Sequence, residues 1–401
     1  MKKILILGGG FAGVDAAIYL RKANYEVTLV SDRDYFYIYP TSIWVPVHKV
    51  KFEDICIDLK ALQKSHGFEL IIDTVEKISA RTNTITLKSG QLLFEYDKLI
   101  IAMGSGKMTH NGIENSLSIC GIPKTSLEIQ NTLDRLLLKG SGEIAFGFGG
   151  NPKDTSAVRG GPAFELLFNV HHMLKKKGIR DNFKLTMFAP MPKPGERMGK
   201  QALAMMDKMF EKSGIIKHFG KKIKRFEDDG VIFEDDSKLK SDFTMFIPAG
   251  DGHAVIKESD LPLSEANFIM INDFCEVIDV DTNGDIEKGA ILENCYAIGD
   301  VSALQGPAWR AKQGHVAEVM AKNVAYNIIQ KDKDSSKRKG YQEHLNILCV
   351  MDSGNGAGFV FRDDKKAFML PMPMVGHWLK KGWGHYCKNT KLGKIPRIPG
   401  M

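Results

Sequence analysis

The first thirty-two residues constrain the fold of this chain more than any other stretch. An apolar run, 4–7, leads directly into Gly8-Gly9-Gly10-Phe11-Ala12-Gly13, and small and apolar residues then follow at helical spacing. Gly8 allows a tight turn, Gly10 lets the backbone approach a pyrophosphate, and Gly13 lets the helix pack on the strand. Unpaired N–H groups at the helix N-terminus suit the phosphates. A second apolar strand follows, so the sequence predicts a dinucleotide-binding βαβ unit.

The residue that would bind the ribose hydroxyls departs from the usual pattern. An acidic residue is expected at the end of the second strand, near position 31. That position is Ser31, and Asp32 and Asp34 lie just beyond it. Ser31 and Asp32 are therefore the candidates for this contact.

Length and composition predict a globular protein of two or three domains. A chain of 401 residues is too long for one small core, and no stretch approaches the roughly 20 apolar residues that cross a bilayer. Because the chain begins with a structural strand, we expect no Sec-type signal peptide and synthesis in the cytoplasm. The net charge of +7 favours anionic surfaces mildly, but no motif indicates nucleic acid as a partner.

No metal site is predicted. The six cysteines are scattered without a CxxC pair, which indicates neither a zinc site nor a secreted disulfide framework. Asp281-Thr282-Asn283-Gly284-Asp285 begins like a calcium loop, but the remaining ligands are missing and a hairpin turn explains the segment.

Three further stretches complete an FAD site. A buried strand ends in Ala102-Met103-Gly104, whose small residues let the backbone pass close to a cofactor. Another strand ends in Gly299-Asp300, about 290 residues after the glycine turn, and its carboxylate can accept a hydrogen bond from a ribityl hydroxyl. A helix predicted over 312–329 could stabilise a reduced, anionic flavin through its N-terminus. The predicted cofactor-binding residues are Gly8, Gly10, Phe11, Ala12, Gly13, Ser31, Asp32, Ala102, Gly104, Gly299, Asp300, Lys312 and Gly314.

A second strand-and-glycine unit begins at Glu143 and reaches Gly147-Phe148-Gly149-Gly150. In a nicotinamide-using flavoprotein this unit would bind NAD(P)H. No close GxGxxG follows, however, and Pro152 interrupts direct entry into a helix. We predict a pseudo-Rossmann domain that lacks the nicotinamide site.

The C-terminal part has a different composition. Segments 368–379 and 383–386 mix Met, Trp, His and Phe, and no acidic residue falls between Val375 and the terminus. Aromatic rings suit a lipid headgroup layer, and basic side chains suit anionic lipid. We predict a peripheral (monotopic) docking site on the cytoplasmic membrane, on a side that the sequence does not specify. The basic residues of this site are Lys380, Lys381, Lys388, Lys391, Lys394 and Arg397.

These motifs resemble those of the sulfide:quinone oxidoreductases and flavocytochrome c sulfide dehydrogenases, which belong to the flavin disulfide reductase superfamily. The resemblance covers nearly the whole chain, and this sequence is a divergent member. The fold that it implies is α/β, with two Rossmann-like (three-layer ββα) domains and a C-terminal membrane-docking region of helices. It also implies bound FAD and a quinone pocket beside the flavin. The most specific segments are 31–36 through Pro40 and Trp44, Gly161-Pro162-Ala163-Phe164-Glu165, Ala297-Ile298-Gly299-Asp300, Lys312-Gln313-Gly314 and Cys349-Val350-Met351-Asp352-Ser353-Gly354.

Domain boundaries follow from the same reading. We assign 1–112 and 243–330 to a discontinuous FAD-binding domain, 113–242 to the second Rossmann-like domain, and 331–401 to the membrane and quinone-site region. A buried strand at 243–247 is expected to return the chain to the first sheet.

The resemblance also implies roles for cysteines. In that family two cysteines on one face of the flavin carry sulfur, and a third lies on an outlying loop. Cys349 stands at the C-terminal catalytic position, Cys120 resembles the outlying cysteine, and Arg159 replaces the remaining redox cysteine. Two alternatives are open for a chain that lacks this second redox cysteine. In the first, Cys120 partners Cys349. In the second, Cys349 works alone while Arg159 attracts hydrosulfide and lowers the thiol pKa. The other cysteines are expected to be buried and inert.

Three functions are compatible with these features. The leading hypothesis is a membrane-associated sulfide:quinone oxidoreductase that passes electrons from sulfide or polysulfide through Cys349 and FAD to a quinone. The second is an NADH:quinone oxidoreductase of the same fold. The third is the flavoprotein subunit of a cytochrome-linked sulfide dehydrogenase. A homo-oligomer is compatible with all three.

Overall fold

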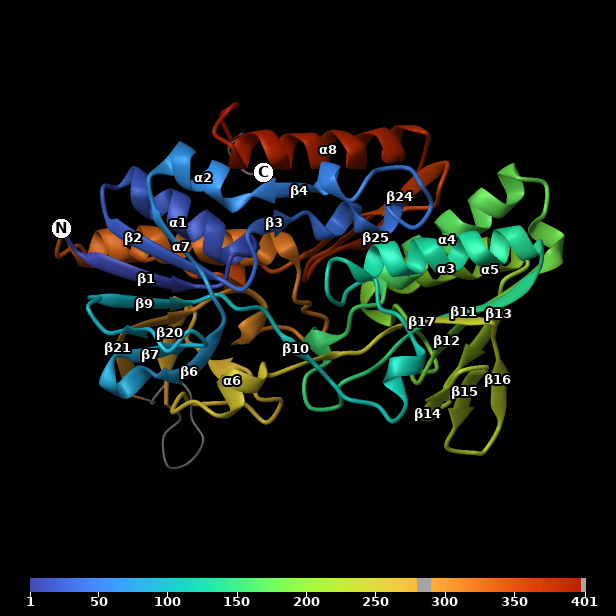
Figure 1. Ribbon diagram of the computed structural model, residues 1–401, viewed down its shortest axis with the longest axis horizontal. Coiled ribbons are helices and arrows are strands. Elements are labelled where there is room, and N and C mark those ends of the chain that lie inside the picture. Colours follow the sequence, from blue (N-terminus) through green and yellow to red (C-terminus); the bar gives the residue numbers. More distant parts are fainter. Residues whose placement is uncertain (280–289, 398–401) are drawn as a thin grey trace.

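A computed structural model describes residues 1–279 and 290–397 as two α/β units side by side, with the C-terminal segment laid across both (Figure 1). The segment 281–285, considered above as a calcium loop, lies outside the described residues. Hydrophobic strands form the centre of each unit, because parallel strands covered on both faces bury nearly every side chain. The two Rossmann-like α/β units that the sequence predicts are therefore present.

The first unit is built on a six-stranded sheet in the order β20-β21-β9-β1-β2-β5. Its strands are parallel except for β20, which runs antiparallel to β21. Helices α1 and α7 pack against each other on this sheet. The sheet and helix bounds are β1 (Lys3–Leu7), α1 (Phe11–Lys22), β2 (Glu26–Ser31), α2 (Leu59–His66), β5 (Glu69–Ile72), β9 (Lys98–Ile101), β20 (Glu276–Ile278), β21 (Ile291–Ala297) and α7 (Gly314–Lys331).

Short strands surround this sheet, most of them in antiparallel pairs. They include the three-stranded β6-β7-β8 sheet, and β10-β18 lies between the two units. The bounds are β3 (Tyr35–Tyr37), β4 (Cys56–Asp58), β6 (Val75–Ser79), β7 (Thr84–Leu87), β8 (Leu92–Leu93), β10 (Gly106–Lys107), β18 (Gly250–Asp251), α6 (Ala254–Lys257), β19 (Ile269–Met270) and β22 (Ser302–Ala303).

The second unit has a four-stranded parallel sheet in the order β13-β12-β11-β17. An antiparallel β14-β15-β16 sheet projects below it (Figure 1). Its core is rich in phenylalanine rings, among them the stacked pair Phe168 and Phe210. The bounds are α3 (Thr125–Lys139), β11 (Gly142–Phe148), α4 (Gly161–Lys176), β12 (Phe183–Ala189), α5 (Lys200–Lys212), β13 (Ile216–Phe219), β14 (Ile223–Glu227), β15 (Gly230–Phe233), β16 (Lys238–Lys240) and β17 (Phe243–Ile247).

The assignment of strand 243–247 to the first sheet is wrong. This strand, β17, pairs in parallel with β11, with Ile144 opposite Phe243 and Phe148 opposite Ile247. All five of its residues are buried, and such a fully apolar strand fits the middle of either parallel sheet. The pairing moves the start of the second FAD-domain segment from 243 to a point after β17.

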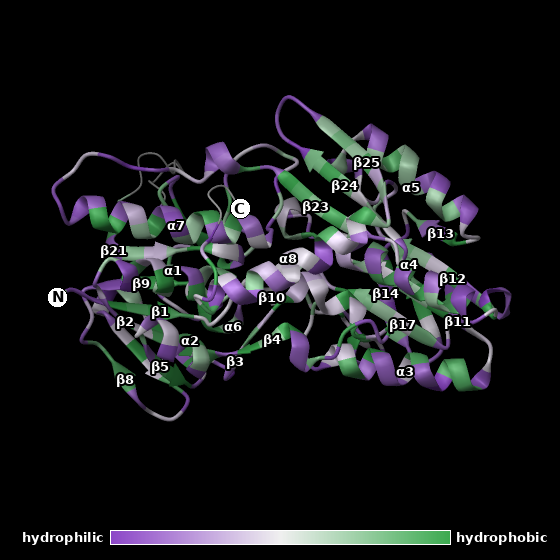
Figure 2. Cartoon of the chain, turned by 90° about the horizontal axis from the view of Figure 1, so that it is seen from above, coloured by the Kyte–Doolittle hydropathy of each residue, from purple (hydrophilic) through white to green (hydrophobic). Residues whose placement is uncertain are grey.

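The C-terminal region combines an antiparallel sheet with one long helix. Strands β23 (Ile347–Asp352), β24 (Gly356–Arg362) and β25 (Ala367–Pro373) lead into α8 (Val375–Lys391). Seen from above, α8 crosses the middle of the molecule, between the first unit and α4 (Figure 2). Among residues 1–279 and 290–397, no helix is long and apolar enough to cross a membrane.

Three of the basic residues predicted to face lipid are turned inward instead. Lys391 forms ion pairs with Asp15 of α1 at 2.6 Å and with Glu318 of α7 at 3.1 Å. Arg397 joins the same two carboxylates at 2.8 and 3.1 Å. Lys380 forms a buried ion pair with Glu165. These three cations attach the tail to the two units, because a charge buried without a partner would be strongly unfavourable.

Candidate active site

The glycine turn after β1 has the shape that its sequence predicts. Gly8 adopts φ +115°, where an L side chain is strained, and a Cβ there would collide with the carbonyl of Ala102. A Cβ at Gly13 would collide with the carbonyl of Gly8, so α1 packs directly on the turn. Gly10 is the N-cap of α1, faces open space and carries no side-chain cap. The N–H groups of the first helical turn are therefore available to an anion.

The second half of the predicted cofactor site lies against the first. A Cβ at Gly299 would lie 3.2 Å from Ala12 in α1 and 3.4 Å from Ala317 in α7. A Cβ at Gly314, where α7 begins, would lie 3.9 Å from the ring of Phe11. Backbone segments about 290 residues apart thus meet at the N-termini of two helices.

A flavin dinucleotide fits this arrangement. Gly104, with φ +74°, faces open space like Gly10, so neither position obstructs a bound group. Gln313 Oε1 and Ser302 Oγ are buried and have no hydrogen-bond partner within the described part of the chain. Buried polar atoms in native proteins are nearly always satisfied, so these two indicate a polar ligand close to the start of α7.

The predicted ribose end is less closely defined. Ser31 is buried, and its hydroxyl donates to the carbonyl of Arg33 at 2.7 Å. Asp32 is largely exposed and lies 3.9 Å from the Arg33 guanidinium. Of the two candidates, only Asp32 presents an accessible carboxylate.

Asp300 and Lys312 have partners that the sequence did not indicate. Asp300 forms an ion pair with Arg159, the residue that stands at the missing cysteine position. Lys312 is buried, donates to the carbonyl of Ser302, and lies 4.0 Å from Asp154 and 3.8 Å from the Phe268 ring centroid. Burial lowers the pKa of Lys312 to about 7, although the negative charge of Asp154 acts to raise it.

The turn of the second unit differs from that of the first. Strand β11 ends at Phe148, but α4 begins only at Gly161, after residues 149–160 have crossed toward Asp300. The space at Gly147 is filled, since a Cβ there would collide with the ring of Phe188. These features agree with the predicted lack of a nicotinamide site, which stays a prediction.

Cys349 lies on β23 at the junction with α4 and α8. Burial raises the pKa of its thiol to about 12, with a smaller contribution from Glu165, while Lys380 acts in the opposite direction. The Cys349 thiol therefore lies within electrostatic range of the buried Glu165–Lys380 ion pair.

Cys120 occupies a more cationic setting. Burial raises the pKa of its thiol, and the charges of Lys107 and Arg159 oppose that shift. Glu165 also acts on Cys120, so this carboxylate lies within electrostatic range of both thiols. Lys107, on β10, was not singled out in the sequence. Burial lowers its pKa to about 8.

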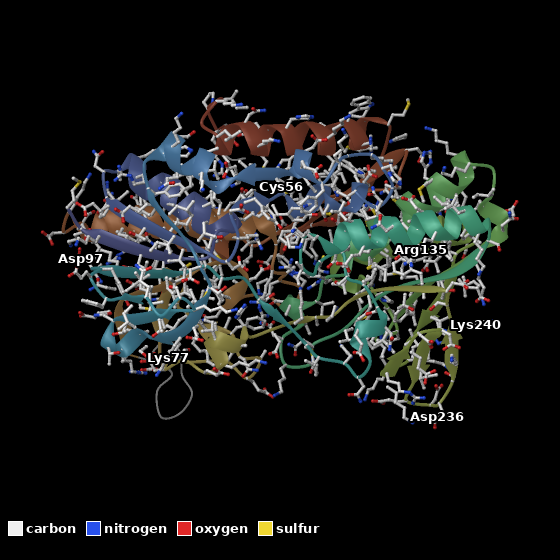
Figure 3. All side chains as sticks on the ribbon, viewed as in Figure 1. Cys56, Lys77, Asp97, Arg135, Asp236 and Lys240 are labelled. Atoms are coloured by element: carbon white, nitrogen blue, oxygen red, sulfur yellow. The ribbon has the colours of Figure 1, made fainter. Side chains whose placement is uncertain are left out.

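The other cysteines belong to packing. All six cysteines fall within the described residues and are free thiols. Cys275, Cys295 and Cys387 are buried, and Cys56 is half-buried on β4, below α8 (Figure 3). Burial raises the pKa of each of these four thiols. Within 1–279 and 290–397, no group of His, Cys, Asp and Glu could hold a metal ion.

Sequence reasoning missed a buried polar cluster beside Cys349. Glu165 and Asp352 lie in two of the segments that carry the family resemblance, and this was the available signal. Their partners Lys380 and His377 come from α8, more than twenty residues further along the chain. Nothing in the local sequence pairs them.

The fold and the glycine turn at the N-terminus of α1 define the class of this protein as a dinucleotide-dependent oxidoreductase. The family model described as pyridine nucleotide-disulphide oxidoreductase matches residues 2–321. The chain is 30% identical to the sulfide-quinone reductase of Aquifex aeolicus (strain VF5), over 97% of this chain and 89% of that protein. It belongs to the pyridine nucleotide-disulphide oxidoreductase family and, within it, to the sulfide:quinone oxidoreductase group of flavoenzymes.

Structural comparison gives the same grouping. The crystal structure of the Aquifex aeolicus sulfide:quinone oxidoreductase superposes with a TM-score of 0.84 at 27% identity, covering 99% of this chain and 93% of that one. A type II NADH:quinone oxidoreductase of Staphylococcus aureus (strain NCTC 8325 / PS 47) is 22% identical over 92% of this chain and 93% of that protein.

Proposed function

We propose that this chain is a membrane-associated sulfide:quinone oxidoreductase in which Cys349 accepts sulfur and FAD carries the electrons. The observation that carries the proposal is the position of Cys349. This thiol lies on β23, which packs against α4 and α8, within electrostatic range of the buried Glu165–Lys380 pair. Similarity to the Aquifex aeolicus sulfide-quinone reductase supports the same assignment.

The cleft residues would hold FAD along its length. The glycine turn and the N-terminus of α1 would hold the pyrophosphate, Asp32 the ribose, and Asp300 the ribityl chain. Lys312 and the N-terminus of α7 would oppose the negative charge of the reduced flavin. When bound, FAD supplies two-electron transfer between thiol and quinone.

The sulfur step needs one thiol and one hydrosulfide. A sulfur–sulfur bond forms between hydrosulfide and the Cys349 thiolate, the S–H bond breaks, and one proton and two electrons are released, the electrons to the oxidant that FAD would supply when bound. Lys380 favours the thiolate and Glu165, whose pKa is raised by burial, can hold the proton. Lys107 and Arg159 add the positive charge that attracts hydrosulfide.

Turnover of sulfide with a water-soluble quinone tests the proposal. It also distinguishes a mechanism with Cys349 alone from one in which Cys120 and Cys349 act as a pair. If Cys349 works alone, Cys349→Ser abolishes turnover and Cys120→Ser retains it. If the two thiols act as a pair, both variants lose it. Cys56→Ser is the matched control, because Cys56 is also half-buried but lies on β4. Equal turnover of Cys349→Ser and the unaltered enzyme would refute the proposal.

Membrane docking is proposed through the apolar surface at the start of α8. Met374, Val375, Trp378 and Leu379 are each more than half exposed, and Lys381 lies 5.5 Å from the Trp378 ring centroid. An exposed apolar patch of this kind, flanked by cations, suits an anionic lipid surface.

Co-sedimentation with phosphatidylglycerol vesicles tests this docking. Trp378→Glu combined with Leu379→Glu should abolish binding. Leu138→Glu should not, because Leu138 is 89% exposed on α3 of the second unit, away from α8. Binding that survives the double substitution would place the lipid surface elsewhere.

The NADH alternative is tested by anaerobic mixing. We expect NADH to leave the flavin oxidised on the millisecond scale and sulfide to bleach it. Rapid bleaching by NADH would favour the NADH:quinone oxidoreductase.

A further inference from the structure

The end of α8 and the segment after it form a buried ion cluster with α1 and α7. Lys391 Nζ lies 2.6 Å from Asp15 Oδ1 of α1 and 3.1 Å from Glu318 Oε1 of α7. Arg397 lies 2.8 Å from Asp15 Oδ2 and 3.1 Å from Glu318 Oε2, so it contacts the second oxygen of each carboxylate. Two cations of the tail therefore bridge the same pair of helices.

Little solvent reaches the centre of this cluster. The side chains of Lys391 and Asp15 are 4% and 2% exposed, and that of Glu318 is 15% exposed. Burial acts to lower the pKa of Lys391, but the charges of Asp15 and Glu318 outweigh it and raise the pKa. Lys391 is therefore a cation, and water and salt screen its attraction to α1 and α7 only weakly.

The cluster lies about one helical turn from both halves of the predicted FAD site. Asp15 is the fifth residue of α1, which follows the glycine turn, and Glu318 is the fifth residue of α7, which begins at Gly314. Lys391 Nζ also lies 5.2 Å from the ring centroid of Phe11, the first residue of α1. The tail thus contacts the two helices whose N-termini would face the cofactor.

The relative position of α1 and α7 matters for the cofactor. A Cβ at Gly299 would lie within 3.4 Å of both Ala12 in α1 and Ala317 in α7, so the two helices and this glycine pack closely. A single FAD molecule would contact both helix N-termini, and its affinity is higher when their spacing is set before it binds. The ion cluster adds a charged bridge that restricts this spacing.

We propose that Lys391 and Arg397 hold the two halves of the FAD site in a fixed relative position, so that the C-terminal tail determines how tightly the cofactor is kept. This inference rests on the binding of FAD in the proposed function. Both are positioning residues, because their contacts reach the cofactor site through α1 and α7. Coupling between two interactions is reciprocal, so FAD should also hold the tail on the protein.

The affinity for FAD tests the role of the tail. Equilibrium dialysis of the full chain against FAD gives the Kd. We expect Lys391→Met to raise the Kd of FAD by about 10- to 100-fold. Lys322→Met is the matched control, because Lys322 is exposed on α7, and it should keep the unaltered Kd. An unchanged Kd in Lys391→Met would overturn the proposal.

A charge-balanced variant separates positioning from a loss of stability. Lys391→Met alone leaves two carboxylates with one cation, which destabilises the fold. Combined with Asp15→Asn, it leaves Glu318 paired with Arg397. Thermal unfolding of the dialysed protein should then return close to the unaltered Tm, while the Kd of FAD stays raised. Recovery of both would show that Lys391 only neutralises charge, and would overturn the proposal.

Trypsin cleavage tests the reciprocal effect of FAD on the tail. Cleavage after Lys391 requires this buried side chain to leave the cluster, so saturating FAD should slow it. Cleavage after Lys177, which is exposed just after α4 in the second unit, is the internal control. Equal cleavage after Lys391 with and without FAD would overturn the proposal. An unaltered protein that takes up no FAD in dialysis would refute the proposed function and this inference with it.

Discussion

The two units carry a buried carboxylate at the same place, and the tail helix supplies a lysine to each. Asp15 is the fifth residue of α1 and pairs with Lys391, while Glu165 is the fifth residue of α4 and pairs with Lys380. Burial acts to raise the pKa of both carboxyls. The net shift is nevertheless downward at Asp15 and upward at Glu165.

Their neighbours explain this difference. Asp15 receives two cations, Lys391 and Arg397, and these hold its pKa below the usual range. Glu165 receives Lys380 alone and has Asp352 nearby, so burial prevails and its pKa is raised. One position in a repeated scaffold therefore serves as a charged anchor in the first unit and as a group that can hold a proton in the second.

The largest expected effect concerns the turns before these two helices. Gly13→Ala should yield protein without FAD, because the new Cβ collides with the Gly8 carbonyl inside the turn. Gly161→Ala at the start of α4 should keep its FAD, since a Cβ there meets nothing within 4 Å. The ratio of flavin to protein absorbance measures both variants, and a flavin-loaded Gly13→Ala protein would contradict the packing described here.

Removal of the lysine on the first unit should be the next largest effect. Lys391→Met leaves Asp15 and Glu318 with Arg397 only, and should lower the free energy of unfolding by about 3–5 kcal/mol. Lys380→Met should cost less, because the raised pKa of Glu165 lets that carboxyl become neutral. Urea denaturation compares the two, with Lys388→Met as the control. A larger loss for Lys380→Met would reverse the assignment of roles.

A smaller effect is expected in the strand of the second unit. Gly147→Ala pushes a methyl group into the Phe188 ring and should cost about 1–3 kcal/mol. Its FAD content should be unchanged, because the space at Gly147 belongs to the core. Loss of flavin from a folded Gly147→Ala protein would show that this strand contacts the cofactor.

The smallest effect is the pH dependence of stability. Glu165 binds a proton more tightly in the folded state, so its contribution to stability falls as pH rises from 4.5 through its raised pKa. Asp15 has the opposite sign: its contribution is present above 3.8 and is lost as pH falls through its lowered pKa. Glu165→Gln should remove the first dependence and Asp15→Asn the second, as read from thermal unfolding across pH 3 to 7.

The parts of the site that local backbone geometry determines could be predicted from the sequence. The contact between Gly13 and the Gly8 carbonyl lies within one short turn, so the glycine spacing indicates it. The approach of Gly299 to Ala12 joins distant segments, and it was predicted because each segment carries its own glycine motif. The partners of Lys391 and Arg159 could not, because residues 376 and 141 positions apart pair only through the fold. Strand 243–247 was assigned to the wrong sheet for a related reason. An all-apolar strand has no sequence feature that indicates which strand it pairs with.

Lys380 and Lys391 of α8 also determine how the tail transmits force. They are eleven residues apart, or about 16 Å along the helix axis, and each is fixed in a different half of the protein. The helix therefore couples the two halves mechanically. A force applied at the exposed Trp378 reaches both of them, through Lys380 in the second unit and Lys391 in the first.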